Sequence, residues 1–330
     1  MADELELLRR ANPVPVDGPH YGDGPLDHTA ERHLDLLLHE HRPPAPRRRT
    51  RLAWGLAASA VVAALVSALL FTGQTTAPAV AAPRPLVVRA ESTPVSMARL
   101  AERAEQAASQ GSPELRKGTH VQSWSLAMSD QDPPITLPQE RIVRWNSDDS
   151  HTELVVATDP RHPGRPVLTD EGGAPRLVDD GHVLNRRTYP PSWSDAPPES
   201  PPPHDPEALH DYLEEAERAF LADHSQPLST AELLDATEIL LDHWTLGPRE
   251  SAALARLLAD AEGLRPVGRV TDRLGRHGQA YVYDGEDSRR MLIMNPADGS
   301  VLGLEQTFTR DDPRYGVTAG DVMTYSAWMR

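Results

Sequence analysis

The feature that most constrains this chain is a stretch of twenty residues, 52–71, without a charged side chain. About twenty such residues in a helix cross a hydrocarbon core of about 30 Å. The run is longer than the apolar region of a signal peptide, which has about 7–15 residues, and it begins late for one. Cleavage after 79–82 stays an alternative. We predict a single transmembrane helix at 52–71.

Basic residues gather on one side of that run. Four arginines precede it: Arg47, Arg48, Arg49 and Arg51. Residues 72–83 carry neither acid nor base. Since arginines beside a membrane helix hold their side in the cytoplasm, we expect a cytoplasmic tail at 1–51. A spacer at 72–90 and an extracytoplasmic domain at 91–330 would follow, which places the chain in the cell membrane as a single-pass protein.

Small residues recur every four positions within the apolar run, at Gly55, Ser59, Ala63 and Ser67. Such a stripe lets two membrane helices approach closely, which predicts a possible homodimer. An alanine-rich helix also shows a stripe of this kind by chance, and the two interpretations stay open.

The tail at 1–51 contains two short amphipathic segments separated by a break rich in Pro and Gly. Their apolar positions are Leu5, Leu7, Leu8, Leu34, Leu37 and Leu38. Segments this short bury too little surface to fold firmly alone, so they fold onto a partner or stay a passive anchor. Four histidines of the second segment (His28, His33, His39 and His41) lack the helical spacing of metal ligands.

The chain has a formal net charge of −16, 32 Pro and no Cys. Nearly all of the negative charge lies after the apolar run. A domain this acidic repels phosphate backbones and anionic lipid surfaces, which argues against nucleic-acid binding and against adsorption to such surfaces. The absence of Cys excludes disulfides, thiolate nucleophiles and the usual zinc sites that contain Cys.

Helices and strands are predicted in separate blocks of the outer domain. A helix at 94–109 precedes strands at 121–128, 141–145 and 152–158. A proline-rich linker at 189–206 comes next. Three helices follow, at 206–221, at 229–244 and from Gly247-Pro248 onward. Further strands are expected at 267–271, 279–283, 290–294, 301–308 and 321–328.

Local signals support these boundaries. Ser229 and Glu232 have the spacing of a capping box at a helix start. Asp284-Gly and Asp298-Gly lie between apolar runs and predict hairpins, which make the sheet antiparallel. We expect an α+β domain with helices packed on one face of an antiparallel sheet. The first strand block is too small to stand alone, so both blocks are expected to share one sheet.

The outer domain offers few residues for chemistry. Asp179-Asp180 and Asp311-Asp312 could hold a cation, but Asp beside turns usually serves local hydrogen bonding. His277 lies in an expected loop. Three serines that could be nucleophiles, Ser92, Ser123 and Ser125, lack a Gly-x-Ser-x-Gly setting. We therefore predict no catalytic residue, no cofactor site and no metal site, and a protein that is not an enzyme.

Several segments together resemble one family of actinobacterial membrane-anchored proteins. They are the opening 3–15, the arginines before the apolar run, and the stretches 272–280 and 292–303. Members are often encoded beside extracytoplasmic-function sigma factors, so the resemblance implies a role like that of an anti-sigma factor. The outer half is also similar to lipoprotein-carrier and sigma-regulator sensor folds. This similarity implies a curved sheet that holds acyl chains or a peptide.

Two functional hypotheses follow. In the first, the outer domain senses a lipid or an envelope ligand, and the tail binds a cytoplasmic partner such as a sigma factor. In the second, the chain is an anchored carrier or scaffold for a lipid or a peptide and acts only outside. Replacing residues 5–40 by an unrelated polar sequence separates the two, because only the first function depends on the tail.

Overall fold

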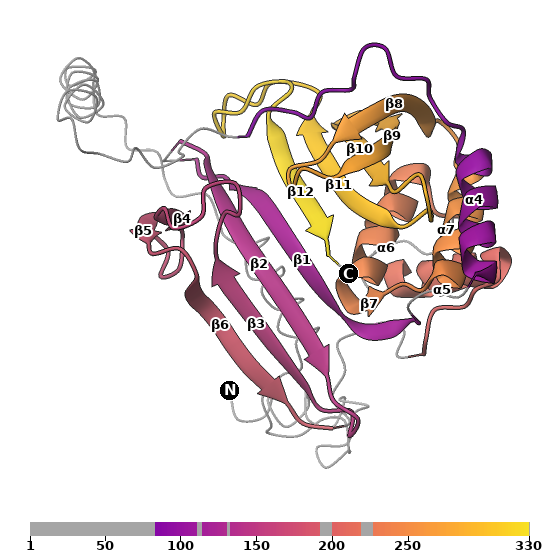
Figure 1. Cartoon of the computed structure of the whole chain (residues 1–330). Helices are drawn as coiled ribbons and strands as arrows, with labels where there is room; N and C mark the ends of the chain where they lie inside the picture. The colour runs from indigo at the N-terminus through magenta and orange to yellow at the C-terminus, as the bar shows by residue number, and fades with distance from the viewer. Residues whose placement is uncertain (1–82, 111–113, 131–132, 192–199, 219–226, 330) are drawn as a thin grey trace, which may run out of the picture. The chain divides into compact units, whose positions relative to one another are not determined.

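The computed structural model of the chain describes residues 83–110, 114–130, 133–191, 200–218 and 227–329. They form a ten-stranded antiparallel sheet, a small two-stranded sheet and four helices (Figure 1). The long sheet runs in the order β6-β3-β2-β1-β12-β11-β10-β9-β8, and β7 pairs with β1.

The first block of the chain supplies one helix and six strands. They are α4 (Met97–Ser109), β1 (Arg116–Ala127), β2 (Ile135–Trp145), β3 (His151–Ala157), β4 (Val167–Thr169), β5 (Arg176–Val178) and β6 (His182–Tyr189). The second block supplies three helices and six strands. They are α5 (Pro206–Arg218), α6 (Thr230–His243), β7 (Trp244–Thr245), α7 (Pro248–Ala259), β8 (Arg265–Thr271), β9 (His277–Asp284), β10 (Ser288–Met294), β11 (Val301–Phe308) and β12 (Val322–Trp328).

The two strand blocks join in one sheet, as the sequence favours. β1 pairs antiparallel with β12, and Val121 lies opposite Trp328 in the register. The last described strand therefore occupies the middle of the sheet and not an edge.

The helices begin where the sequence signals them. Ser229 caps α6 in a capping box, because its Oγ accepts from the Glu232 amide while the Glu232 carboxylate accepts from the Ser229 amide. Pro248 occupies the first turn of α7, where its missing N–H costs no hydrogen bond. Both predicted helix starts are confirmed.

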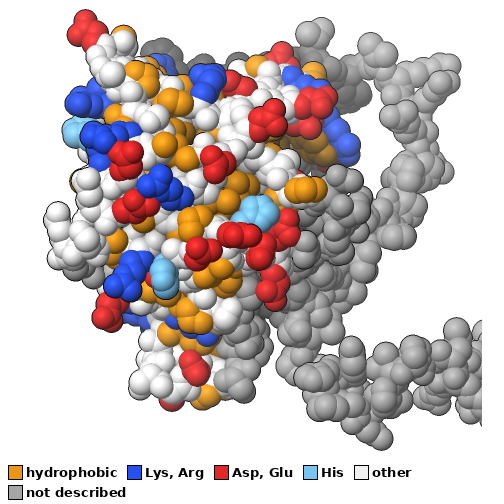
Figure 2. Space-filling view, turned by 90° about the vertical axis from the view of Figure 1, so that its right-hand side faces the viewer, with side chains coloured by type: hydrophobic (Ala, Val, Ile, Leu, Met, Phe, Trp, Pro, Cys, Tyr) orange, Lys and Arg blue, Asp and Glu red, His pale blue; other side chains and the backbone are white. Residues whose placement is uncertain are grey.

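One face of the β8–β12 half is covered by this helix layer (Figure 1). Leucines that are fully buried or nearly so connect α5, α6, α7 and β10 in one core: Leu209, Leu213, Leu234, Leu254, Leu258 and Leu292. On the outer surface that includes α4, acidic, basic and apolar side chains are interspersed, with acidic ones more numerous toward one side (Figure 2).

Residues 84–92, which we call the strap, pack on the opposite face of the same half. Leu86 and Val88 pack on a second core that contains Trp124 and Tyr325. Beneath the strap lies an ion pair between Arg273 and Glu305, whose side chains are 5% and 2% exposed. The Leu86 amide donates to Glu305 Oε1 (2.8 Å), which ties the strap to that pair.

The other half of the sheet, which we call the wing, consists of β2, β3 and β6. Figure 1 shows the described helices on the β8–β12 half, with β3 and β6 extending beyond them. Most side chains of β3 are half-buried, and most of those of β6 are exposed. The β4–β5 hairpin packs against one end of the wing through a small cluster: Ala157, Val167, Val178 and Leu184.

The predicted fold class, a transmembrane helix followed by an α+β domain, is wrong. A membrane crossing requires about 20 apolar residues, and the longest described helix, α6, has 14. None of the helices that the structure describes is long and apolar enough for a crossing. The described part is instead mostly a large antiparallel sheet with four helices. The sheet has more strands than the sequence predicts. Strands such as β6 show no apolar alternation and were therefore not predicted.

Two sets of predicted residues lie outside the described residues. They are the tail leucines (Leu5, Leu7, Leu8, Leu34, Leu37 and Leu38) and the small-residue stripe (Gly55, Ser59, Ala63 and Ser67). The segment predicted as a membrane helix, 52–71, lies outside them as well.

Candidate functional site

A gap beside the first residues of β1 forms the candidate site. The Met329 amide donates to the His120 carbonyl (2.7 Å), and β12 pairs with β1 no further toward its start. β7 takes the same side of β1 at Arg116 and Lys117. The Thr245 hydroxyl donates to the Gly118 carbonyl (2.9 Å). Between the end of β12 and β7, residues 118–120 of β1 are not paired with a strand on this side.

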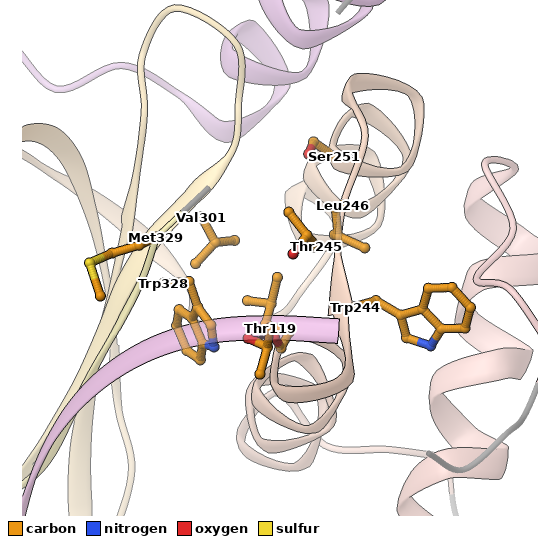
Figure 3. Close-up of a pocket in the computed structure, with 9 residues that line it drawn as sticks. Thr119, Trp244, Thr245, Leu246, Ser251, Val301, Trp328 and Met329 are labelled. Carbon is orange, nitrogen blue, oxygen red and sulfur yellow. Dashed lines mark hydrogen bonds between the residues drawn. The ribbon is translucent and has the colours of Figure 1, made fainter. Parts of the chain in front are cut away.

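A small cavity lies on the helix side of this gap (Figure 3). Its volume is about 20 Å³, which is room for about one water molecule. Strand ends and the start of α7 line it: Thr119, Leu241, Trp244, Thr245, Leu246, Ser251, Val301, Trp328 and Met329. The Thr119 hydroxyl donates to the Leu241 carbonyl (2.8 Å), so this polar wall is tied to α6.

A larger pocket of about 390 Å³, which we call the mouth, shares Thr119, Thr245 and Met329 with that cavity. Its other lining residues come from β1 and β2: Arg116, Lys117, Gly118, His120, Ile142, Val143, Arg144 and Trp145. Ligand pockets usually have volumes of about 300–1,000 Å³, so the mouth can hold a small molecule or a few residues of a peptide.

The charges of the mouth are basic. Arg116, Lys117 and Arg144 line it, and its described lining contains no carboxylate. Lys117 Nζ lies 3.5 Å from the centre of the Trp145 ring, a cation–π contact. Within the part of the chain that the structure describes, no carboxylate pairs with Arg116 or Arg144.

Stacked rings support the mouth from the wing. Trp145 stacks on His151 with centroids 4.1 Å apart, and His151 stacks on Tyr189 at 4.5 Å. Arg187 lies over the Tyr189 ring, 4.9 Å from its centroid. Three neighbouring strands thus hold the Trp145 ring in one orientation.

Gly118 shapes the floor of the mouth. Its φ is +110°, a conformation that side chains with a Cβ rarely adopt. A Cβ at this position would lie 2.5 Å from the Val143 carbonyl oxygen. A larger residue would therefore both strain β1 and fill the pocket.

Behind the small cavity, α6 turns three carboxylates toward the sheet: Asp235, Glu238 and Asp242, which we call the carboxylate row. Arg290 donates to Asp235 through Nε (3.0 Å) and Nη2 (2.8 Å). The Ser326 hydroxyl donates to Glu238 (2.6 Å), and Trp328 Nε1 donates to Asp242 (2.9 Å).

Burial changes the acidity of this row. Burial, reinforced by the neighbouring Asp242, raises the pKa of Glu238 to about 7. Burial also raises the pKa of Asp242, against the opposing charge of Arg141. On α5, burial and the nearby Asp235 and Glu232 raise the pKa of Glu217 to about 7. Glu238 and Glu217 can therefore change protonation near neutral pH.

The aspartates predicted as possible cation ligands serve local structure instead. Asp180 accepts from the Thr158 hydroxyl (2.6 Å) and the Gly164 amide (2.7 Å). Asp311 and Asp312 accept from loop amides (2.8 and 3.0 Å). Among the described residues, no group of three or more His, Asp or Glu could hold a metal ion.

The remaining candidates of the sequence do not line the mouth. Ser92 belongs to the strap and accepts from the Arg269 amide (2.8 Å). The Ser123 hydroxyl donates to the Gln139 carbonyl (3.4 Å). His277 was expected in a loop, but it is the first residue of β9. The structure brings none of these described residues into a catalytic arrangement.

The sequence analysis did not single out the residues of the mouth. Lys117 precedes the expected first strand, and the Arg144-Trp145 pair was used only to place a strand. A signal was present, since Arg116-Lys117 is a basic pair in a chain of net charge −16. Its meaning depends on β1 and β2 being neighbours, which sequence alone does not give.

No protein-family model matches the chain, and the comparison with curated proteins finds no relative.

Proposed function

We propose that the described domain is the ligand-binding part of a regulatory protein, and that it binds an anionic ligand of the cell envelope in the mouth. Its partner would be a cytoplasmic protein such as a sigma factor, reached through the tail at 1–51. Binding without chemical conversion is the activity proposed for it.

The observation that carries this proposal is the set of three cations around one open pocket. Arg116, Lys117 and Arg144 are among the residues that line a volume of about 390 Å³ in a strongly acidic chain. Cations that gather against the overall charge attract a negatively charged ligand and exclude positively charged ones. Trp145 adds a flat apolar surface whose orientation is fixed by the ring stack.

The shared chemistry of the ligand is a phosphate or a carboxylate beside an apolar part. Arginine guanidinium groups bind both anions with paired hydrogen bonds. Ile142 and Val143 supply the apolar wall of the mouth. A lipid headgroup and an acidic peptide both fit this description.

Calorimetric titration of the full-length chain with two soluble probes tests the proposal. Glycerol 3-phosphate stands for a lipid headgroup, and triglutamate stands for an acidic peptide. We expect one of them to bind and Arg144→Gln to weaken its binding about tenfold, since a charge-assisted contact is lost. Arg314→Gln, which removes an exposed arginine that does not line the mouth, is the matched control.

Which of the two probes binds indicates whether the anion belongs to a peptide or to a lipid headgroup. Binding of triglutamate alone favours a peptide, and binding of glycerol 3-phosphate alone favours a headgroup. If neither probe binds, or if Arg144→Gln and Arg314→Gln weaken binding equally, the mouth is not the ligand site and the proposal fails.

The regulatory part of the proposal has its own test. A crosslinking pull-down compares the full-length chain with a chain that lacks residues 1–45. A sigma factor recovered only with the full-length chain supports regulation. The same partners recovered with both chains would exclude it.

A further inference from the structure

A second pocket lies at β8 and β9, which are at the opposite end of the strand order from the wing. Its volume is about 360 Å³. It lies between the start of α4, the β8–β9 edge and the turn after β10, and is lined by Val95, Arg103, Arg269, His277, Gly278, Gln279, Pro296 and Ala297. We call it the edge pocket.

The strap forms one border of this pocket because it docks on the free edge of β8. The Arg89 amide donates to the Arg269 carbonyl (2.9 Å), and the Arg269 amide donates to Ser92 Oγ (2.8 Å). At the adjacent bulge, a Cβ on Gly268 would lie 2.3 Å from Ser92 Oγ. The strap and β8 therefore fit together only with glycine at that position.

The wall of the pocket is mostly apolar, through Val95, Pro296 and Ala297. Two arginines lie in this wall, from different elements. Arg103 on α4 donates to the Pro296 carbonyl (3.3 Å), and Arg269 on β8 is exposed. Neither arginine pairs with a carboxylate of the described chain. The pocket thus combines an apolar interior with uncompensated positive charge.

His277 adds a polar group at the same border. Its Nδ1 lies 3.0 Å from the Thr271 hydroxyl and 3.5 Å from an Arg89 nitrogen. Thr271 and Arg269 face the same side of β8, opposite His277 and Gln279 of β9. An anion near Arg269 would therefore lie beside further hydrogen-bond donors of the strap and of β9.

We propose that the edge pocket binds an amphipathic carboxylate, with its apolar body between Val95 and Pro296 and its carboxylate at Arg103 and Arg269. At ~30 Å³ per water-sized group, the volume holds about twelve such groups, which matches a monocarboxylate of about ten carbons. The wall excludes strongly hydrated anions, because they would lose water against apolar side chains.

Binding there connects two parts of the fold. The ligand would contact α4 through Arg103 and the sheet through Arg269, and Arg269 also holds the strap. A ligand that binds the protein more tightly when the strap is docked on β8 than when it is undocked stabilises the docked strap. The ligand is therefore expected to slow hydrogen exchange of the Arg269 and Arg89 amides.

The test titrates the full-length chain with decanoate, followed by calorimetry and by hydrogen exchange. We expect decanoate to bind, decanol and acetate to bind at least tenfold more weakly, and exchange of the two amides to slow. Arg269→Gln is expected to weaken decanoate binding about tenfold. Ala297→Trp, which fills the pocket from an exposed turn, is expected to abolish it.

Arg314→Gln is the matched control, since it removes an exposed arginine that lines neither the edge pocket nor the mouth. It is expected to leave decanoate binding unchanged. Equal binding of decanol and decanoate, or unchanged binding in both Arg269→Gln and Ala297→Trp, would overturn the inference. Either result leaves the proposal for the mouth untouched, because that proposal depends on other residues and other probes.

Discussion

The half of the sheet formed by β8–β12, which we call the enclosed half, has a buried core on each face, one beneath the helices and one on which the strap packs. The wing has half-buried and exposed side chains on both faces. The same backbone ladder runs through both halves. Their stability must therefore come from different sources: buried apolar area in the enclosed half, and backbone pairing with ring stacking in the wing.

The mouth lies where these two halves meet. Its β1 residues are fixed by β7 and α6, whereas Trp145 belongs to the wing and is held by stacked rings. A ligand in the mouth would touch a rigid wall and a less enclosed one. The difference between the halves thus predicts that ligand binding changes the conformation of the wing more than that of the β8–β12 half.

The largest effect is expected from the buried ion pair of the enclosed half. Glu305→Ala leaves Arg273 as a buried charge without its partner and removes the acceptor of the Leu86 amide. We expect a loss of about 4 kcal/mol in the free energy of unfolding, measured by urea denaturation. Asp284→Ala, which breaks the exposed pairs with Arg265 and Arg289, is the control and should cost less than about 1 kcal/mol. Similar losses in both variants would contradict the enclosure of the pair.

Matched truncations of leucine compare the halves directly. Leu292 is 1% exposed in the core under the helices, so Leu292→Ala is expected to cost about 3 kcal/mol. Leu154 of the wing is half-buried, and Leu154→Ala should cost about 1 kcal/mol. Thermal and chemical denaturation measure both. If Leu154→Ala costs as much as Leu292→Ala, the wing is covered by a part of the protein outside the described residues.

Glu238→Gln tests the pH dependence of the enclosed half. The pKa of Glu238 is raised from 4.5 to about 7, so the folded state binds its proton more tightly than the unfolded chain. This stabilisation is complete below pH ~4.5 and is lost as pH rises through about 7. The glutamine variant should therefore be more stable than the native chain by about 2 kcal/mol at pH 8 and no more stable at pH 4.

The Ser326 hydroxyl can still donate to the glutamine oxygen, so the hydrogen bond itself is kept. A stability difference that is the same at pH 4 and pH 8 would show that Glu238 does not titrate in this range. Ser326→Ala separates the effect of the hydrogen bond from that of the charge, because it removes the hydrogen bond and keeps the carboxyl.

The smallest effect is expected at the start of α6. Ser229→Ala removes the side-chain oxygen that accepts from the Glu232 amide (3.3 Å). Loss of an N-cap costs about 1 kcal/mol, and urea denaturation can resolve a change of that size. Ser229→Asp keeps an acceptor and should retain most of the stability. A loss as large in the aspartate variant as in the alanine variant would contradict the capping role.

Local signals predicted much of the enclosed half. The capping box of α6, the proline of α7 and Asp298-Gly between β10 and β11 depend on neighbours in sequence. The strand β6 was missed because Asn185-Arg186-Arg187 shows no alternation, since neither face of that strand is buried. Burial pattern predicts strands only where one face meets a core.

Long-range contacts explain the remaining differences. The sequence predicts a spacer through residue 90, whereas residues 84–92 dock on the sheet through Leu86, Val88 and Ser92. The mouth and the edge pocket likewise join residues that are far apart in sequence. The register of β1 with β2 brings the charges of the mouth together, and the packing of α4 beside β8 brings Arg103 and Arg269 to the edge pocket.

The central place of β12 has a consequence for biosynthesis. A ribosome delivers β1 about two hundred residues before β12, its neighbour on one side, as the register of Val121 with Trp328 requires. Until β12 arrives, β1 and β11 both expose unpaired edges, and such edges promote aggregation. Pairings this distant in sequence also form slowly. The nascent domain is therefore expected to depend on a holdase, and a premature stop shortly before β12 would divide the sheet in two.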